Sequence, residues 1–591
     1  MNQIYKRKKK KEKRKNHNRR ISAWLNIFSP FVFCFLIFLT GCVSENIDDQ
    51  SYLTSYQQSL TNRSPRRQTE TTDANFAGPL EILKPVPSPE NPLPEIEFST
   101  DPNTGKKIAG LTIEQAIARS LANSPEIIVV SFDPSIARQD ITRAASDFDF
   151  TAFSSLNYEN EDNPANSIYQ PGQSESRAFE SGIRQKTITG SEWSLSYALT
   201  RSWDDLSGRT LSTRYEPILG FQLRQPLLRD AWQDVTLAGV DIAKLNYKIS
   251  LLGFRQKAEQ IATQVISTYW RLLQARNDLE IYRELLKRTL ETKEKVEGRR
   301  EIDATEVHIR QTEAYVKTRE AALLQANRRV SDAQDVLVRL MADSQLNVLE
   351  EFNIIPASPP SLNKSELEVT ELLEVAVQKN PVIQQARIGI EIADINIRVA
   401  ENRDMPRLDL LTSARTQSLA GGYENANERL SNGDYVSYGA GLSLEYPLGN
   451  RKREAELLQR RIERRKAVTI LENIADQAAQ LTKEKIRGVE TNFSEIQIQK
   501  AAVEAARIHL KVLEDSEIIQ DKLTPEFLLV KLQAQESLAN AQMAETRAII
   551  DFNIALAELS QTLGTVLEMH QVEQSLPIVR DSDSISGQAA N

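Results

Sequence analysis

Two long proline-free stretches govern how this 591-residue sequence can fold. The first runs from 235 to 297, and apolar residues recur along it on the four-three spacing of a heptad seam. At about 1.5 Å per residue, a helix of this length extends roughly 90 to 100 Å, so it must project from any compact core. A second such stretch runs from 451 to about 519. The seam residues of the first are Ile261, Val265, Leu272, Leu279, Tyr282 and Leu286.

A strand-like segment precedes each long stretch, and the two segments are copies of one another. Residues 220–227 read Gly-Phe-Gln-Leu-Arg-Gln-Pro-Leu, and residues 441–448, at an offset of 221, read Gly-Leu-Ser-Leu-Glu-Tyr-Pro-Leu. The approach to each segment is duplicated at an offset of 256, which aligns Pro125 with Pro381 and Ile127 with Ile383. A repeat of this size sets the architecture. Each half therefore reads as short helices, strands, a long helix, a turn and a return helix.

The repeats and the composition between them give the predicted boundaries. The chain begins with a signal peptide at 1–41 and a disordered Pro-rich tether at 42–108, and it ends with a disordered tail at 568–591. The first repeat spans 109–342, with strands within about 148–226, a long helix at 235–297 and a return helix at 306–341. A crossing segment at 343–367 leads to the second repeat at 368–567, with strands within about 407–446, a long helix at 451–519 and a return helix at 526–563.

The N-terminus is interpreted as a lipoprotein signal. Residues 1–20 hold eleven Lys and Arg against one Glu, residues 21–39 are apolar, and Thr-Gly-Cys42 follows. This order is typical of a secretory signal with a small-residue cleavage site, and its end resembles the lipobox of bacterial lipoproteins, whose cysteine is lipidated. The alternatives are a nucleic-acid-binding arm for the basic block and an ordinary cysteine after a membrane anchor for Cys42.

Cleavage before Cys42 changes the charge of the chain. Taking the eleven basic residues and one acidic residue of 1–41 away from totals of 73 and 81 leaves 62 and 80, a net charge of −18. That charge argues against a nucleic-acid partner. Cys34 is lost with the signal, so the mature chain has no internal disulfide. Val43 stands where an Asp would signal inner-membrane retention in enteric lipoproteins, so by resemblance the anchor lies in outer-membrane lipid.

Several segments within 148–226 and 407–446 alternate apolar and polar residues, the period of a strand with two different faces. Residues 193–203 are numerous enough to cross a bilayer at about 45° tilt, and aromatic residues at the ends suit the girdles of membrane barrels. A soluble sandwich strand shows the same alternation, but its recurrence in 438–446 favours the membrane. We expect two strands from the second repeat and two or four from the first, depending on the hairpin near 179–203. The girdle candidates are Trp193, Trp203, Tyr438 and Tyr446.

So few strands cannot close a barrel within one chain, and hydrocarbon does not tolerate an open sheet edge. Several copies must therefore complete one barrel, and helices that leave the same side of the strands would pack from neighbour to neighbour as a hollow tube. The predicted fold class is mainly α with membrane β. Long antiparallel helical hairpins form an α-barrel, and strands are contributed to a shared transmembrane β-barrel, with an internal two-fold sequence repeat.

Residues 111–567 resemble the TolC family of outer-membrane efflux and secretion ducts, on the duplication, the strand-Pro-Leu-helix joints and the turns at the helix ends. The resemblance implies a homotrimer with a 12-stranded barrel in the outer membrane and a helical tunnel through the periplasm. It also implies a passive duct whose entrance meets a periplasmic adaptor protein and an inner-membrane pump or exporter. Drug efflux, metal efflux and protein secretion all use this duct, and the sequence does not separate them.

The resemblance also places the periplasmic entrance, where the adaptor docks, at the far ends of the long helices. Relatives often have Gly where Asp521 stands and an Asp where Phe527 stands, and Asp303 follows Gly298 by five residues where six is common. An acidic ring that favours cations and a set of merely solvated helix ends are therefore both open. The residues carried over are Gly298, Arg299, Arg300, Asp303, Thr305, Asp521, Lys522, Thr524 and Pro525.

No catalytic, metal-binding or cofactor motif emerges from the sequence. It contains no Gly-x-Ser-x-Gly motif and no phosphate-binding loop, and the spacing around the four histidines does not match a metal site. The protein is therefore predicted not to be an enzyme. The rival interpretation is a lipid-anchored periplasmic coiled-coil protein, structural or adhesive and without a pore, which leaves the alternating strands unexplained. The histidines are His17, His308, His509 and His570.

Overall fold

The structure is a computed structural model, and it describes residues 98–100, 107–164, 167, 169–206, 208–302, 304–343, 345–346, 352–363, 368–519 and 524–570. The predicted signal, Cys42, most of the tether and residues 571–591 of the tail lie outside this set.

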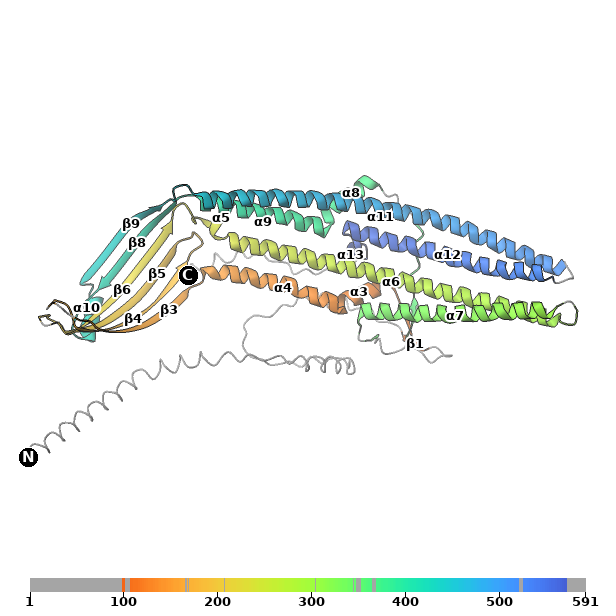
Figure 1. Ribbon diagram of the computed structural model, residues 1–591, viewed down its shortest axis with the longest axis horizontal. Coiled ribbons are helices and arrows are strands. Elements are labelled where there is room, and N and C mark those ends of the chain that lie inside the picture. Colours follow the sequence, from red (N-terminus) through yellow and green to blue (C-terminus); the bar gives the residue numbers. More distant parts are fainter. Residues whose placement is uncertain are drawn as a thin grey trace, which may run out of the picture. The chain divides into compact units, whose positions relative to one another are not determined.

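Long helices make up most of the described chain (Figure 1). Each repeat supplies one antiparallel pair, in which the long helix packs along the return helix that follows it. The return helix of the second pair also packs along the long helix of the first, which joins the two pairs. The pairs are α6 (Ala238–Gly298) with α7 (Glu306–Met341), and α11 (Arg451–Ile519) with α12 (Pro525–Leu563).

Shorter helices complete the bundle at the strand-proximal end. The helix α4 (Pro125–Ala145) packs along α6, and α9 (Pro381–Asp404) packs along both α11 and α6. Each follows a short helix, α3 (Ile113–Asn123) or α8 (Val369–Lys379), and each starts with proline at its first turn, where the missing N–H costs nothing. The remaining helical turns are η1 (Ser146–Phe148), α5 (Gln233–Thr236), α10 (Tyr423–Ser431) and α13 (Val566–Met569).

The alternating segments form a single antiparallel sheet of six strands in the order β3-β4-β5-β6-β8-β9. The first repeat contributes four strands and the second contributes two, so the hairpin whose membership was left open does join the sheet. Three copies would supply eighteen strands rather than the twelve that the family resemblance implies. The bounds are β3 (Thr151–Asp162), β4 (Gln173–Lys186), β5 (Glu192–Asp204), β6 (Thr213–Pro226), β8 (Arg407–Gln417) and β9 (Tyr435–Glu445).

A second, smaller sheet lies beside the middle of the long helices, in the order β1-β2-β7. The strand β1 (Phe98–Thr100) lies within the predicted tether, β2 (Lys107–Leu111) spans the tether's predicted end, and β7 (Phe352–Pro356) lies within the predicted crossing segment. Because β2 and β7 pair in parallel, residues about 245 positions apart become neighbours. Both connecting segments are therefore partly ordered against the helices.

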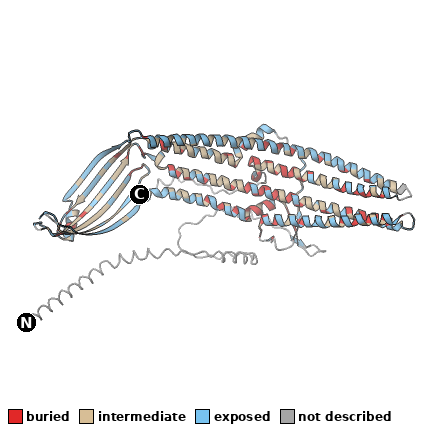
Figure 2. Cartoon of the chain, in the orientation of Figure 1, coloured by how far each residue is buried: buried red, intermediate tan, exposed pale blue. Residues whose placement is uncertain are grey.

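The largest hydrophobic core forms where α6 meets this small sheet and α3. Ile261, Val265, Leu272 and Leu279 of the predicted seam are all buried there. Tyr269 is also fully buried, and its hydroxyl donates to the Leu111 carbonyl at 3.0 Å. Figure 2 shows buried residues gathered along the middle of the helices, whereas the six-stranded sheet is mostly exposed or intermediate. The predicted fold class is confirmed.

Candidate functional site

The six-stranded sheet has one apolar and one polar face. Residues directly opposite one another in an antiparallel sheet lie on the same face, so the pairing Ala152–Ile183–Leu195–Phe221–Ala414–Tyr438 traces one row across all six strands. Along each strand, residues an even number of positions from this row lie on the same face, and the large apolar side chains of this face are exposed. They include Leu156, Phe179, Ile183, Leu195, Leu219, Phe221, Tyr438, Leu442 and Leu444. A continuous exposed apolar face of this kind suits contact with lipid hydrocarbon.

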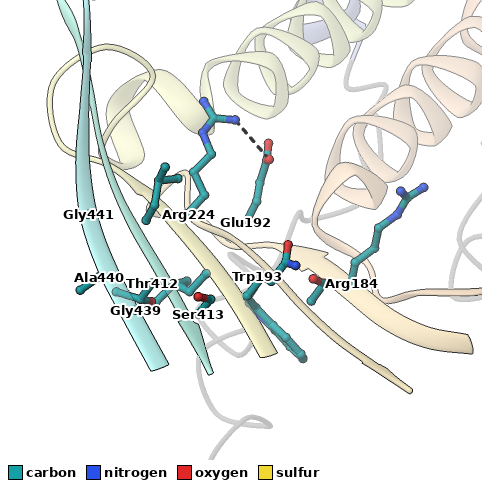
Figure 3. A pocket seen from close by; sticks show the side chains of 13 residues that line it. Arg184, Glu192, Trp193, Arg224, Thr412, Ser413, Gly439, Ala440 and Gly441 are labelled. Carbon is teal, nitrogen blue, oxygen red and sulfur yellow. Dashed lines mark hydrogen bonds and ion pairs between the residues drawn. The ribbon is translucent and has the colours of Figure 1, made fainter. Parts of the chain in front are cut away.

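The opposite face carries small and polar residues. Ser194, Gln222, Ser413 and Gly439 form the adjacent row across four strands. A pocket of about 660 Å³ opens on the helix-proximal part of these strands, as Figure 3 shows. The guanidinium groups of Arg184 and Arg224 and the carboxylate of Glu192 belong to its lining. This face is suited to water rather than to lipid.

The predicted girdle residues lie at different places in the sheet. Trp193 and Trp203 stand near the two ends of β5 on the apolar face, eleven residues apart counting both. Tyr438 is 89% exposed on the same face, but it lies in the row of Leu195 and Phe221. Tyr446 follows the last residue of β9 and is exposed. Their contact with a lipid interface stays a prediction.

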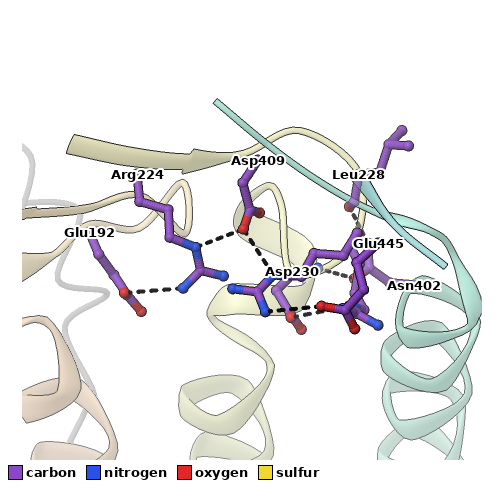
Figure 4. A network of polar contacts seen from close by, with 9 residues as sticks. Glu192, Arg224, Leu228, Asp230, Asn402, Asp409 and Glu445 are labelled. Atoms are coloured by element: carbon purple, nitrogen blue, oxygen red, sulfur yellow. Dashed lines mark hydrogen bonds and ion pairs between the residues drawn. The ribbon is translucent and has the colours of Figure 1, made fainter. Parts of the chain in front are cut away.

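Where the sheet meets the helices, charged residues from both repeats form one network (Figure 4). The buried Asp409 accepts hydrogen bonds from the guanidinium groups of Arg224 at 2.9 Å and Arg407 at 2.8 Å. Arg224 also reaches Glu192 at 3.4 Å, and Arg407 lies 3.8 Å from Glu445. Charge-assisted bonds of this kind resist separation more than neutral ones. The strands of the two repeats are thus fixed to each other at their helix-proximal ends.

The joint between β6 and α6 is held by a side chain of the other repeat. Asp230 and Trp232 have φ values of 60° and 74°, a conformation that residues with a side chain rarely adopt. Asn402 of α9 accepts a hydrogen bond from the Asp230 amide at 2.7 Å and donates one to the Leu228 carbonyl at 3.1 Å. These bonds offset the cost of the backbone conformation and set the direction in which α6 leaves the sheet.

At the far end of the helices, the structure describes six of the nine predicted entrance residues. Gly298 ends α6, and Arg299 and Arg300 follow it in a turn. Thr305 is the N-cap of α7, and Thr524 is the N-cap of α12 and accepts a hydrogen bond from the Phe527 amide at 3.3 Å. The remaining residues are Pro525, which is the first residue of α12, and Asp303, Asp521 and Lys522, which lie outside the described residues.

A buried polar cluster behind these ends was not predicted. Arg319 of α7 is 4% exposed and donates to the side chains of Thr289 in α6 and Gln535 in α12 and to the Leu532 carbonyl in α12. It therefore connects both helical pairs, and burial lowers the pKa of its guanidinium. The sequence did hold a signal: Arg319 occupies a seam position of α7, on the same three-four spacing as Val316, Leu323, Ala326 and Val330.

Membrane-spanning helices and metal-binding clusters are both absent from the described residues. None of their helices combines the length and apolar character needed to cross a bilayer. Within the same ranges, no three His, Cys, Asp or Glu side chains are grouped so that they could hold a metal ion.

Comparison with known proteins identifies the class of fold. The chain is similar to solved outer-membrane proteins: the outer membrane protein VceC from Vibrio cholerae (18% identity, 76% of this chain and 96% of that chain, TM-score 0.54), the CmeC outer membrane channel of Campylobacter jejuni (12%, 78% and 87%, 0.55) and the open state of the MtrE outer membrane channel of Neisseria gonorrhoeae (16%, 77% and 89%, 0.56). It therefore has the fold of these outer-membrane channels.

A narrower match comes from the second repeat. Residues 372–520 match the model of the outer membrane efflux protein family. None of the curated protein sequences compared with the chain matches it. The predicted resemblance to TolC-family outer-membrane channels is thus confirmed, by the family-model match within the second repeat and by the fold of the described chain.

Proposed function

We propose that this protein is the outer-membrane channel-tunnel of a tripartite efflux or type I secretion system, a passive duct from the periplasm to the exterior. The observation that carries the proposal is the two-faced sheet continuing into long helical pairs. The apolar face suits hydrocarbon and the polar face suits a water-filled lumen. The rival coiled-coil interpretation gives no purpose to the exposed apolar face.

The partners of the proposed duct follow from its passive nature. A duct without an energy source requires a pump or exporter in the inner membrane, and a periplasmic adaptor protein to connect the two. Copies of this chain must surround the lumen, because a six-stranded sheet has two open edges, and we take the assembly to be a homotrimer. We further propose that Cys42 carries the lipid anchor in the outer membrane of a Gram-negative bacterium and that no nucleic acid is bound.

The test of this function is ion conduction by the purified mature protein in planar bilayers. We expect stable single-channel currents, together with heat-modifiable mobility of outer-membrane fractions on gels, because the closed barrel resists denaturant until it is heated. A water-soluble rod that gives no current would rule the channel out and leave the coiled-coil alternative. The accumulation of an exported compound after deletion would then identify the substrate class.

The entrance ring gives a second expected result. Three symmetry-related carboxylates in a narrow tube would favour cations, so Asp303→Asn and Asp521→Asn should each lower the cation preference of the single-channel current. Reversal potentials across a salt gradient measure this preference. Arg310→Gln on the exposed side of α7 is a suitable control. Unchanged selectivity in both Asn variants would mean that these carboxylates are solvated helix ends.

A further inference from the structure

The two edges of the large sheet belong to strands of different repeats. Within the described residues, β3 is paired only with β4 and β9 only with β8. Their outer backbone N–H and C=O groups therefore face away from the sheet, and hydrocarbon cannot satisfy them. Figure 1 shows the two strands at opposite edges. If the protein spans the outer membrane as proposed above, each edge needs a strand from another copy.

The internal repeat indicates which strands meet. In each repeat a first strand follows a helix that begins at proline: β3 begins 26 residues after Pro125, and β8 begins 26 residues after Pro381. In each repeat a last strand leads into the Pro-Leu joint: β6 ends at Pro226, and β9 ends at Glu445, two residues before Pro447. Within the chain, the last strand of the first repeat pairs with the first strand of the second, as β6 with β8. The equivalent contact between copies is β9 with β3.

The same equivalence fixes the register of this contact. Leu223 of β6 lies opposite Thr412 of β8. Moving Leu223 forward by the offset of 221 gives Leu444, and moving Thr412 back by the offset of 256 gives Leu156. We propose that β9 of one copy pairs antiparallel with β3 of a second copy of this chain, with Leu444 opposite Leu156, so that each chain contributes six strands to one closed barrel.

Two properties of the sheet support this register. Leu444 and Leu156 both lie on the apolar face, 69% and 70% exposed, and the next pair along that face is Leu442 with Tyr158. A shift by one residue would turn apolar side chains toward the lumen. The register also sets the stagger, which is the offset along the strand direction after crossing the six strands of one copy. The row that begins at Ala152 reaches Tyr438, whose partner becomes Asp162 of the next copy, ten residues further along β3.

This stagger and the strand number define the barrel. An offset of ten residues, at about 3.4 Å per residue, accumulates across six strands that lie about 4.8 Å apart. These lengths correspond to a strand tilt of roughly 50° from the barrel axis, close to the tilts of known barrels. In the trimer, six strands per chain give eighteen in total. Because diameter grows about linearly with strand number, this barrel is about 1.5 times as wide as a 12-stranded one. The inserted hairpin β4–β5 is the source of the difference.

Four cysteine substitutions in two arrangements test the register. Ser443 and Asn157 lie opposite one another on the lumenal face in the proposed register, as do Gly441 and Glu159. We expect efficient oxidation to linked copies in the double variants Ser443→Cys with Asn157→Cys and Gly441→Cys with Glu159→Cys. The exchanged combinations, Ser443→Cys with Glu159→Cys and Gly441→Cys with Asn157→Cys, should give roughly tenfold less, because diagonal neighbours lie about 7–8 Å apart, farther than disulfide geometry favours.

The exchanged combinations contain the same four substitutions, so differences in folding cannot mimic the expected pattern. Gly441 accommodates a side chain, since a Cβ there meets nothing within 4 Å, and single-cysteine variants control for Cys42. If the largest cross-linked product on a gel contains three chains, the eighteen-stranded barrel is supported. If the largest product contains two chains, the eighteen-stranded barrel is ruled out. More product from an exchanged combination overturns the register. Ion currents without any linkage overturn the strand pairing but not the channel, whereas loss of both overturns the proposed function.

Discussion

Leu199→Arg is expected to reduce the amount of assembled protein in the outer membrane severalfold. Leu199 lies on the apolar face near the middle of β5, opposite Phe179 and Pro217. An arginine on the lipid face near the bilayer midplane costs about 2–4 kcal/mol. Three copies would place three such charges in one barrel. Heat-modifiable mobility of outer-membrane fractions measures the assembled amount.

The matched control is the neighbouring substitution Ala198→Arg. Ala198 belongs to the opposite face and lies directly across from Glu180 of β4, a favourable neighbour for a guanidinium. We expect this variant to assemble normally. Equal assembly of the two variants would contradict the assignment of faces, and a reversed order would mean that the faces are exchanged. A soluble coiled-coil protein would show little difference between them.

Arg319→Met is expected to loosen the far ends of the two helical pairs. The substitution preserves packing volume but removes the donors to Thr289, Gln535 and the Leu532 carbonyl, which are all buried behind the helix ends. Losing charge-assisted bonds and leaving buried acceptors unpaired costs about 3 kcal/mol. If local opening governs exchange, amide hydrogen exchange in residues 285–298 and 528–538 should accelerate roughly a hundredfold.

Arg310→Met serves as the control for this substitution. Arg310 lies on the same helix, but it is 70% exposed and pairs with Glu306 and Glu313, each about one turn away. Exposed pairs of this kind contribute about 0.3–0.5 kcal/mol, so exchange at the helix ends should stay within about threefold. If Arg319→Met leaves exchange unchanged as well, the buried cluster does not hold the two pairs together.

Much of the helical architecture could be predicted because helical periodicity is local. The seam of α6 is visible within any window of eleven to eighteen residues, and the structure buries Ile261, Val265 and Leu272. The return helix predicted at 306–341 coincides with α7. The Pro-Leu joint recurs at an offset of 221, so the end of β6 at Pro226 indicated the end of β9 to within two residues.

Other features could not be predicted, because they depend on contacts between distant residues. The alternation in residues 179–203 showed two faces but not whether the hairpin would pair with β3 and β6. The polar segment 160–176 concealed the end of β3 and the start of β4, which pair through Asp162 and Gln173. The composition of the tether gave no sign that β2 would pair with β7. Each depends on a partner chosen in three dimensions.

The sequence by itself determined the two-fold repeat, the long helices and the two-faced strands, because each is a pattern of near neighbours along the chain. The tertiary structure alone decided that six strands share one sheet and that Arg319 and Asn402 connect the repeats. Strand pairing and buried hydrogen bonds depend on which distant groups meet, and that choice is made by the whole packed chain.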